Sequence, residues 1–291
     1  MNCKFPPRRS YVVPFAHGGQ LRLGERPLIM AILNVTPDSF AETSSYLDPA
    51  RAIDAALGME ADGADLIDVG GESTRPGADP VPAAEEAARV LPVVRALAGR
   101  LRIPISVDTY KAEVARAALG AGAAFINDVS GLRYDPGLGR VVADAGAGLI
   151  LMHTRGRSNA MYAEAAYDDV IVEVAGELQS SIADAAAAGV SLDRIIVDPG
   201  VGFAKRPADS YGVLARLAML AEMLDRPLLV GPSRKSFMRE ALNDRPASER
   251  DWGTAAAVTA AVLAGAHIVR VHHVEAMAQV VRVAEEIRRR A

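Results

Sequence analysis

The sequence predicts a single α/β domain folded as a (β/α)8 TIM barrel, in which each parallel strand is followed by a helix. Short apolar runs alternate with helix-like segments along the 291 residues, and no linker or low-complexity tract divides them. The expected strands are 28–33, 64–69, 103–107, 123–126, 148–152, 194–197, 228–230 and 267–271. Helix-like segments between them include 49–61, 83–98, 111–119, 168–188, 210–224 and 252–263. A doubly wound sheet is disfavoured, because no Gly-x-Gly-x-x-Gly follows the first strand.

The segment before the first strand predicts a β-hairpin. Two apolar runs, 11–15 and 21–23, flank a turn that contains Gly18 and Gly19. We expect this hairpin to plug the bottom of the barrel, at the amino ends of the strands. The predicted organisation is an N-terminal extension over residues 1–26 and a barrel over residues 27–291, forming one domain.

The composition indicates an ordinary globular protein that binds neither nucleic acid nor a membrane. Half of the residues are apolar and the net charge is −4, so there is no basic excess to attract phosphates or anionic lipids. No apolar run approaches the roughly 18 residues that a membrane span requires. The single cysteine, Cys3, excludes an internal disulfide and fits a reducing compartment. Because the N-terminus also lacks the apolar stretch of a signal peptide, we expect a cytoplasmic protein.

Polar side chains follow every predicted strand at its carboxyl end, the edge where such barrels carry their chemistry. These residues are Asn34, Asp68 to Glu72, Asp108, Asn127 with Asp128, His153, Asp198, Lys235, and Arg270 with His272. Packing alone does not explain acids, amides and bases at all strand ends. We therefore expect a large polar site at this edge.

The first two loops offer ligands for a cation and for an anion. Asn34 has an amide oxygen that a hard cation accepts, although an asparagine here can equally cap a turn. Segment 68–77 has glycines that allow close backbone approach, and its Thr74 and Arg75 can bind an anion. The alternative for this segment is a flexible surface turn.

Strand alternation orders the acids of the third and fourth strands. Ser106 and Asp108 share one face of their strand, but Asp108 is also suited to capping the helix that follows. Asn127 and Asp128 are ambiguous in the same way, because one of the pair can serve only to brace a neighbouring loop.

The sixth and seventh loops point to a heterocyclic ligand. Pro199 and two glycines make a rigid turn that directs Asp198 upwards, where a carboxylate suits an edge with two adjacent N–H donors. Segment 231–236 lacks the second glycine that a nucleotide phosphate loop requires. Lys235 is therefore expected to donate to a carbonyl or ring nitrogen, and Ser236 to bind a carboxylate.

The end of the last strand is ordered by the same alternation. Arg270 and His272 face one side and His273 faces the other, so the adjacent histidines cannot chelate one metal ion together. No His-x-His follows the first strand either, which disfavours a zinc hydrolase.

Taken in order, segments 34–40, 68–77, 107–109, 126–131, 152–153, 198–205, 231–237 and 270–272 resemble the dihydropteroate synthases. The resemblance covers nearly the whole chain. It implies a transferase of folate biosynthesis that condenses 6-hydroxymethyl-7,8-dihydropterin diphosphate with p-aminobenzoate and releases 7,8-dihydropteroate and pyrophosphate. It also implies the use of Mg2+ and a homodimer formed through the last helices, in a family that is a sulfonamide target.

The same resemblance implies a role for individual residues. Those that would hold the pterin are Asp108, Asn127, Met152, Asp198, Phe203, Lys235 and Arg270. The diphosphate would be held by Asn34, which is also the implied magnesium ligand, and by Thr74, Arg270 and His272. The p-aminobenzoate site would be formed by Phe40, Thr74, Arg75, Pro76 and Ser236. The implied catalytic residues are Asp108, Lys235, Arg270 and His272.

Three positions depart from the family's pattern. Segment 41–45 replaces the usual Asp-Gly-Gly of the first loop, Ala204 replaces a common glycine, and His273 replaces a usual aspartate.

Two other functions are alternatives to the synthase. A pterin-dependent methyltransferase acting on a corrinoid protein would share the barrel but needs no residues for a diphosphate. A non-catalytic pterin-binding paralogue is the other alternative.

Overall fold

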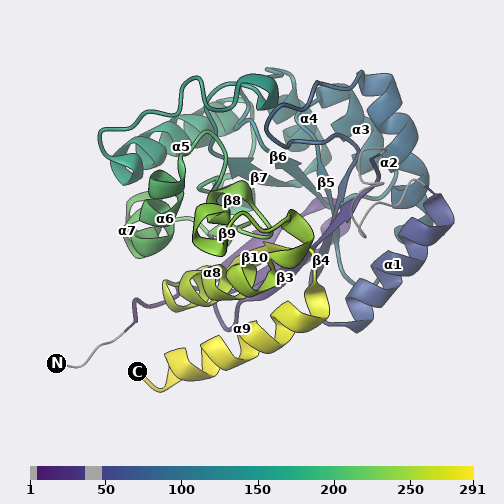
Figure 1. Cartoon of the computed structure of the whole chain (residues 1–291). Helices are drawn as coiled ribbons and strands as arrows, with labels where there is room; N and C mark the ends of the chain where they lie inside the picture. The colour runs from purple at the N-terminus through teal and green to yellow at the C-terminus, as the bar shows by residue number, and fades with distance from the viewer. Residues whose placement is uncertain (1–4, 37–47) are drawn as a thin grey trace.

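Eight parallel strands form one closed barrel in the computed structural model, which describes residues 5–36 and 48–291 (Figure 1). The strands are β3 (Leu28–Asn34), β4 (Leu66–Gly70), β5 (Ile105–Asp108), β6 (Phe125–Asp128), β7 (Gly148–Met152), β8 (Ile195–Asp198), β9 (Leu229–Val230) and β10 (Ile268–Val271). Their order is β8-β7-β6-β5-β4-β3-β10-β9, and a parallel bridge between Val197 and Leu228 joins the two ends. The predicted barrel is confirmed.

Helices surround the strands as an outer layer (Figure 1). They are α1 (Pro49–Ala61), α2 (Ala83–Leu97), α3 (Ala112–Gly120), α4 (Leu138–Ala145), α5 (Val170–Ala187), α6 (Pro207–Ala215), α7 (Leu217–Leu224), α8 (Asp251–Leu263) and α9 (Val274–Arg289). In the part of the chain that the structure describes, no helix is both long and apolar enough to cross a membrane.

The alternation of side chains along each strand separates the outer core from the barrel interior. Residues such as Ile67 and Val107 face outward and pack in the cluster beneath the helices. The inward-facing residues near the start of each strand form an apolar layer, the floor of the barrel interior. They are Leu28, Met30, Leu66, Phe125, Ile150, Ile196, Leu229 and Ile268. Because the period is two, the polar residues at the strand ends stand directly above this floor.

The register between strands places these polar residues in one layer. Asn34 pairs with Gly70, Gly70 pairs with Asp108, and Asp108 pairs with Asn127. On the other side of the barrel Met152 pairs with Asp198. Ligand-binding side chains far apart in the sequence therefore lie around one opening.

The N-terminal hairpin closes the opposite end, as expected. Its strands β1 (Tyr11–Pro14) and β2 (Gln20–Leu23) are antiparallel. Val13 and Leu21 belong to the same apolar cluster as the barrel floor, and the ring of Phe15 lies 5.1 Å from that of Phe125. The hairpin supplies the lower half of the interior packing and leaves the upper end open.

The largest difference from the expected elements is in segment 210–224, which forms two helices instead of one. Arg216 interrupts it with φ −114° and ψ 22°, outside the helical region, and its guanidinium bonds Asp169 at 3.0 Å. Helices α4 and α9 were not among the segments named from the sequence. The starts of β4, β5 and β6 lie two residues later than expected. For β5 a side-chain contact accounts for the shift, because the Glu60 carboxylate accepts the N–H groups of Arg102 and Ile103.

Candidate functional site

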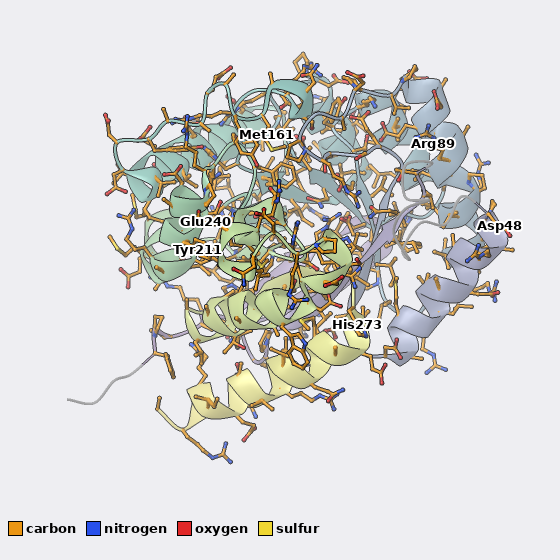
Figure 2. All side chains as sticks on the ribbon, in the orientation of Figure 1. Asp48, Arg89, Met161, Tyr211, Glu240 and His273 are labelled. Atoms are coloured by element: carbon orange, nitrogen blue, oxygen red, sulfur yellow. The ribbon has the colours of Figure 1, made fainter. Side chains whose placement is uncertain are left out.

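A cavity of about 400 Å3 opens at the carboxyl ends of the strands. Its volume suits a small organic ligand. The predicted site residues that line it are Asn34, Thr74, Arg75, Pro76, Asp108, Phe203, Lys235, Ser236, Arg270 and His272. Met161 also lines it, from the loop after β7 (Figure 2). Phe40 and segment 41–45 lie outside the described residues, so their predicted roles stay predictions.

Three predicted pterin residues lie deeper than the cavity wall. Asn127, Met152 and Asp198 are each buried, and Met152 packs with Phe203 in a small cluster of its own. These three come from β6, β7 and β8, and Lys235 enters from the loop after β9. The structure thus brings the predicted pterin residues together at one side of the barrel mouth.

A network of two carboxylates and one guanidinium crosses the centre of the site. Arg270 donates from Nε to Asp68 Oδ2 at 2.6 Å and from Nη2 to Asp108 Oδ2 at 2.9 Å. Asp68 Oδ2 also accepts from Nδ2 of Asn127 at 2.9 Å. Asp108 therefore serves the site rather than capping α3, whose first N–H is accepted by Asp135.

Burial controls the charges in this network. It raises the pKa of Asp108, and the negative charges of Asp68, Glu86 and Glu72 act in the same direction, whereas Arg270 opposes the shift. The two nearby carboxylates outweigh the burial of Arg270 and raise the pKa of its guanidinium. Arg270 is thus a fixed cation that holds the two acids beside the cavity.

Asp198, which is buried, and Lys235, which is partly buried at the cavity wall, form a second pair of opposite charges. Asp198 Oδ1 accepts the N–H of Gly200 at 2.7 Å. Burial raises the pKa of Asp198, and Lys235 opposes this most strongly. Burial lowers the pKa of Lys235 to about 7, and its Nζ lies 2.6 Å from the carbonyl oxygen of Val201 and 4.2 Å above the ring of Phe203. From the wall of the cavity, Lys235 can donate N–H groups to a ligand.

His272 is held as a neutral donor. Burial, together with the cations Arg234, Arg270 and Arg75, lowers its pKa to about 3. Ser233 Oγ accepts the backbone N–H of His272 at 3.3 Å and lies 2.9 Å from its Nδ1. When the serine hydroxyl donates to Nδ1, the proton of the neutral ring is on Nε2, where it can be donated to an anion in the cavity.

His273 points away from the cavity, as strand alternation predicts. It stands at the start of α9 (Figure 2), and its side chain is 48 % exposed. Its Nδ1 lies 3.1 Å from Oδ2 of Asp251, which also holds Arg234 through bonds of 2.7 and 2.9 Å. Although residue 273 departs from the family's aspartate, its side chain still supports the end of β10 through Asp251.

The loops around the mouth are linked to one another. Glu72 accepts from Tyr110 at 2.9 Å and from Lys111 at 2.5 Å, which anchors the loop after β4. That loop bonds the loop after β7 through the N–H of Gly77 and the carbonyl of Ser158, at 2.8 Å. Tyr162 of the same β7 loop lies 3.2 Å from Oγ of Ser236. The β7 loop therefore connects the walls of the predicted p-aminobenzoate site.

Asp68 and Ser233 are among the residues of the site that were not assigned a role from the sequence. Asp68 shares the inward parity of Leu66 and Gly70, so its place beneath Arg270 could have been read from strand alternation. Ser233 gave no such signal, because its contact with His272 depends on how two loops pack. Asp128 proves to be the member of its pair that braces a loop, since it accepts the N–H groups of Ser130 and Leu132.

Comparisons with known proteins identify the family of the chain. The sequence profile of the family described as "Pterin binding enzyme" matches residues 30–272. The chain therefore belongs to the pterin binding enzymes.

Within that family its relatives are dihydropteroate synthases. The Synechocystis dihydropteroate synthase is 46 % identical over 91 % of both chains, and the Escherichia coli one is 44 % identical over 93 % of this chain and 95 % of its own. A Yersinia pestis dihydropteroate synthase solved with a sulfonamide drug superposes with a TM-score of 0.89 at 41 % identity, covering 94 % of this chain and 98 % of that one. The Burkholderia cenocepacia enzyme in complex with 7,8-dihydropteroate gives a TM-score of 0.86 at 41 % identity, covering 98 % of both chains.

Proposed function

We propose that the chain catalyses the dihydropteroate synthase reaction with the residues around this cavity. The observation that carries the proposal is the inward layer itself, in which buried carboxylates, an amide and a lysine surround one opening beside Arg270 and His272. The relatives bind the corresponding ligands: the Xanthomonas albilineans synthase was solved with 4-aminobenzoic acid and is 42 % identical, with a TM-score of 0.86, covering 94 % of this chain and 98 % of that one.

The deep side of the site suits the amino-pyrimidinone edge of a pterin. Asp198 is placed to accept two adjacent N–H groups, and Asn127 offers both an acceptor and a donor. Lys235 is placed to donate to the ring oxygen or a ring nitrogen, and Phe203 and Met152 supply apolar surface for the ring. The polar pairing matters because a buried donor without a partner costs about 1–3 kcal/mol.

The mouth of the site suits a departing diphosphate. In the reaction the bond between the pterin methylene carbon and the diphosphate oxygen breaks, and the aryl amine nitrogen forms a new bond to that carbon and then loses a proton. Arg270 and the Nε2–H of His272 offset the charge that develops on the leaving oxygen. Asp108 stabilises positive charge that develops on the dihydropterin, and no strong general base is required because an aryl amine is already nucleophilic.

The residues at this mouth fit a magnesium ion. Asn34 lines the cavity and stands beside Gly70 and Asp108 in the register. Magnesium commonly takes one or two protein oxygens together with phosphate oxygens and water, so the Asn34 amide oxygen is the protein ligand that we assign. Bound there, the ion would offset negative charge on the diphosphate.

The amine site lies between the second and seventh loops. Thr74, Arg75, Pro76 and Ser236 line the same cavity, and we assign the carboxylate of p-aminobenzoate to Ser236. Because this site is completed by the bound diphosphate and both loops, p-aminobenzoate should bind weakly until the pterin and pyrophosphate are present. Calorimetry with and without these two ligands measures the difference.

An assay of pyrophosphate release tests the proposed reaction. Purified protein with magnesium should release pyrophosphate and form dihydropteroate in equal amounts, and only when both substrates are present. Pterin binding without product would favour the non-catalytic paralogue, whereas methyl transfer from a methylated pterin to a corrinoid would favour the methyltransferase.

The proposed assembly is a homodimer formed through α8 and α9. These helices lie side by side (Figure 1) and expose apolar side chains, with Trp252 84 %, Val283 61 % and Ile287 49 % exposed. Light scattering should give the mass of two chains, and Val283→Glu combined with Ile287→Glu should shift it towards one.

A further inference from the structure

A chain of buried titratable groups lies beneath the turn that follows β8. The side chain of Lys205 is almost fully buried, with Nζ 2.8 Å from Nδ1 of His153 and 3.2 Å from the carbonyl oxygen of Phe203. On the far side of the imidazole, Nε2 lies 3.2 Å from Oε2 of Glu177 on α5. None of these three side chains has a part in the reaction outlined above.

One arrangement of protons that fits these distances keeps Lys205 charged. An ammonium at Lys205 donates to Nδ1 of His153 and to the Phe203 carbonyl, which leaves the ring proton on Nε2 to be donated to Glu177. Burial, reinforced by Lys205, lowers the pKa of His153 to about 4, so the ring is neutral. Burial works against ionisation of Glu177, but hydrogen bonds from His153 and Arg155 outweigh it and hold its pKa below the usual range.

The turn above Lys205 has an unfavourable backbone. Gly200, Gly202 and Ala204 have φ values of +65°, +80° and +46°, and Ala204 lacks the freedom of glycine in this region. A side chain at Gly200 would collide with the carbonyl oxygen of His153. Such a turn keeps its shape only if surrounding contacts hold it.

Those contacts converge on Lys205 and its neighbours. Lys205 Nζ holds the carbonyl of Phe203, whose ring lines the cavity beneath Lys235. The hydroxyl of Tyr167 holds the carbonyl of Ala204 at 2.9 Å. The same turn begins with Asp198, so the anchor and the pterin floor belong to one segment of eight residues, 198–205.

We propose that Lys205 is a positioning residue for the pterin: through His153 and the Phe203 carbonyl it fixes the turn that presents Asp198 and Phe203, and its charge supports the Asp198 carboxylate. The inference rests on the proposed function, because it takes Asp198 as the acceptor for the pterin.

The charge of Lys205 affects the pKa of Asp198. Asp198 is faced by the cations Lys235, Arg270 and Lys205, which oppose the rise in its pKa that burial causes. Burial lowers the pKa of Lys205 to about 7, while Asp198 and Glu177 raise it and Lys235 and Arg155 lower it. Removal of the Lys205 charge therefore raises the pKa of Asp198 further, and protonation of Asp198 then begins at a higher pH.

The test compares Lys205→Met with the wild type in calorimetric titrations of the pterin diphosphate over the whole pH range in which both proteins stay folded. We expect pterin affinity to fall by about tenfold or more, since a charge and its hydrogen bonds are lost. We also expect the affinity of the variant to begin falling at a higher pH than that of the wild type. The KM for p-aminobenzoate should stay unchanged.

Two further variants separate positioning from a loss of folding. Arg8→Met removes another buried cation, paired with Glu285 at 2.9 Å, and should lower the melting temperature without changing pterin affinity or its pH profile. Glu177→Gln alters the partly exposed end of the chain and should shift the pH profile in the same direction as Lys205→Met, but less. If Lys205→Met does not fold, the pterin affinity and pH profile of Glu177→Gln test the role of Lys205 in its place.

The proposal is overturned if the wild type forms dihydropteroate while Lys205→Met, or Glu177→Gln in its place, keeps wild-type pterin affinity and pH profile. A wild type that binds pterin but forms no product overturns the proposed reaction instead, and leaves these binding titrations to decide the role of Lys205.

Discussion

Replacement of Asp68 by asparagine should weaken binding of the pterin diphosphate, mainly through Arg270. Asp68 is fully buried and its Oδ2 accepts from both Arg270 and Asn127. Arg270 would keep its bond to Asp108, so the loss is one charge-assisted hydrogen bond, worth about 1.5–3 kcal/mol. The Kd of the pterin diphosphate should therefore rise by about 10- to 150-fold.

The matched control is Asp128→Asn. Asp128 is equally buried and ends β6, which lies two strands from β4 in the barrel, but its carboxylate faces outward and holds Ser130 and Leu132. This variant should lose stability while pterin diphosphate affinity stays close to that of the wild type. Calorimetric titration and thermal unfolding of both variants give the comparison. Equal losses of affinity in the two variants would refute the assignment by strand parity.

Three further predictions follow from the same contacts. Asp198→Ala should weaken pterin binding by about 1–3 kcal/mol or more, measured by calorimetry, because ligand N–H donors lose their acceptor. His272→Ala should cost about 1.5–3 kcal/mol in kcat/KM, whereas His273→Asp should change it little, because His273 braces Asp251 outside the cavity. His267→Gln should reduce acid lability: burial lowers the pKa of His267 from 6.5 to about 4, so only the unfolded chain takes up the proton between these values. The free energy of unfolding of the wild type then falls as pH drops through that window, by about 1.4 kcal/mol per pH unit and about 3 kcal/mol in all, as denaturant titrations can measure.

Each of these predictions has a clear contrary outcome. Wild-type pterin affinity in Asp198→Ala would mean that the pterin binds to other strands. A loss in His273→Asp as large as that in His272→Ala would mean that the register of β10 is wrong. An unchanged pH slope in His267→Gln, with the exposed His17→Gln as control, would mean that burial does not lower the pKa of His267 in the folded protein.

Much of the barrel was predictable because burial on both faces leaves a local signal. The runs at 28–33 and 148–152 are apolar enough to be read as strands, and a period of two then places Asp108 and Asn127 inside. The same rule separates Arg270 and His272 from His273. Where two functions for one residue were open, as for Asp108, the structure was needed to show that Arg270 and not α3 is its partner.

The remainder depends on contacts between segments that the sequence does not connect. Lys205 meets His153 only because the turn after β8 folds back over the end of β7, and Ser233 meets His272 only because two loops pack together. The break at Arg216 likewise depends on Asp169, 47 residues earlier. Local periodicity contains none of this information.

The most direct test of the account is a crystal structure with the bound pterin diphosphate and magnesium. The account predicts that the amino-pyrimidinone edge lies within hydrogen-bonding distance of Asp198 and Asn127, with the diphosphate at Arg270 and His272. A pterin bound instead in the neighbouring hollow beside Tyr162 and Arg239, or one whose edge faces the loop at Thr74, would contradict it.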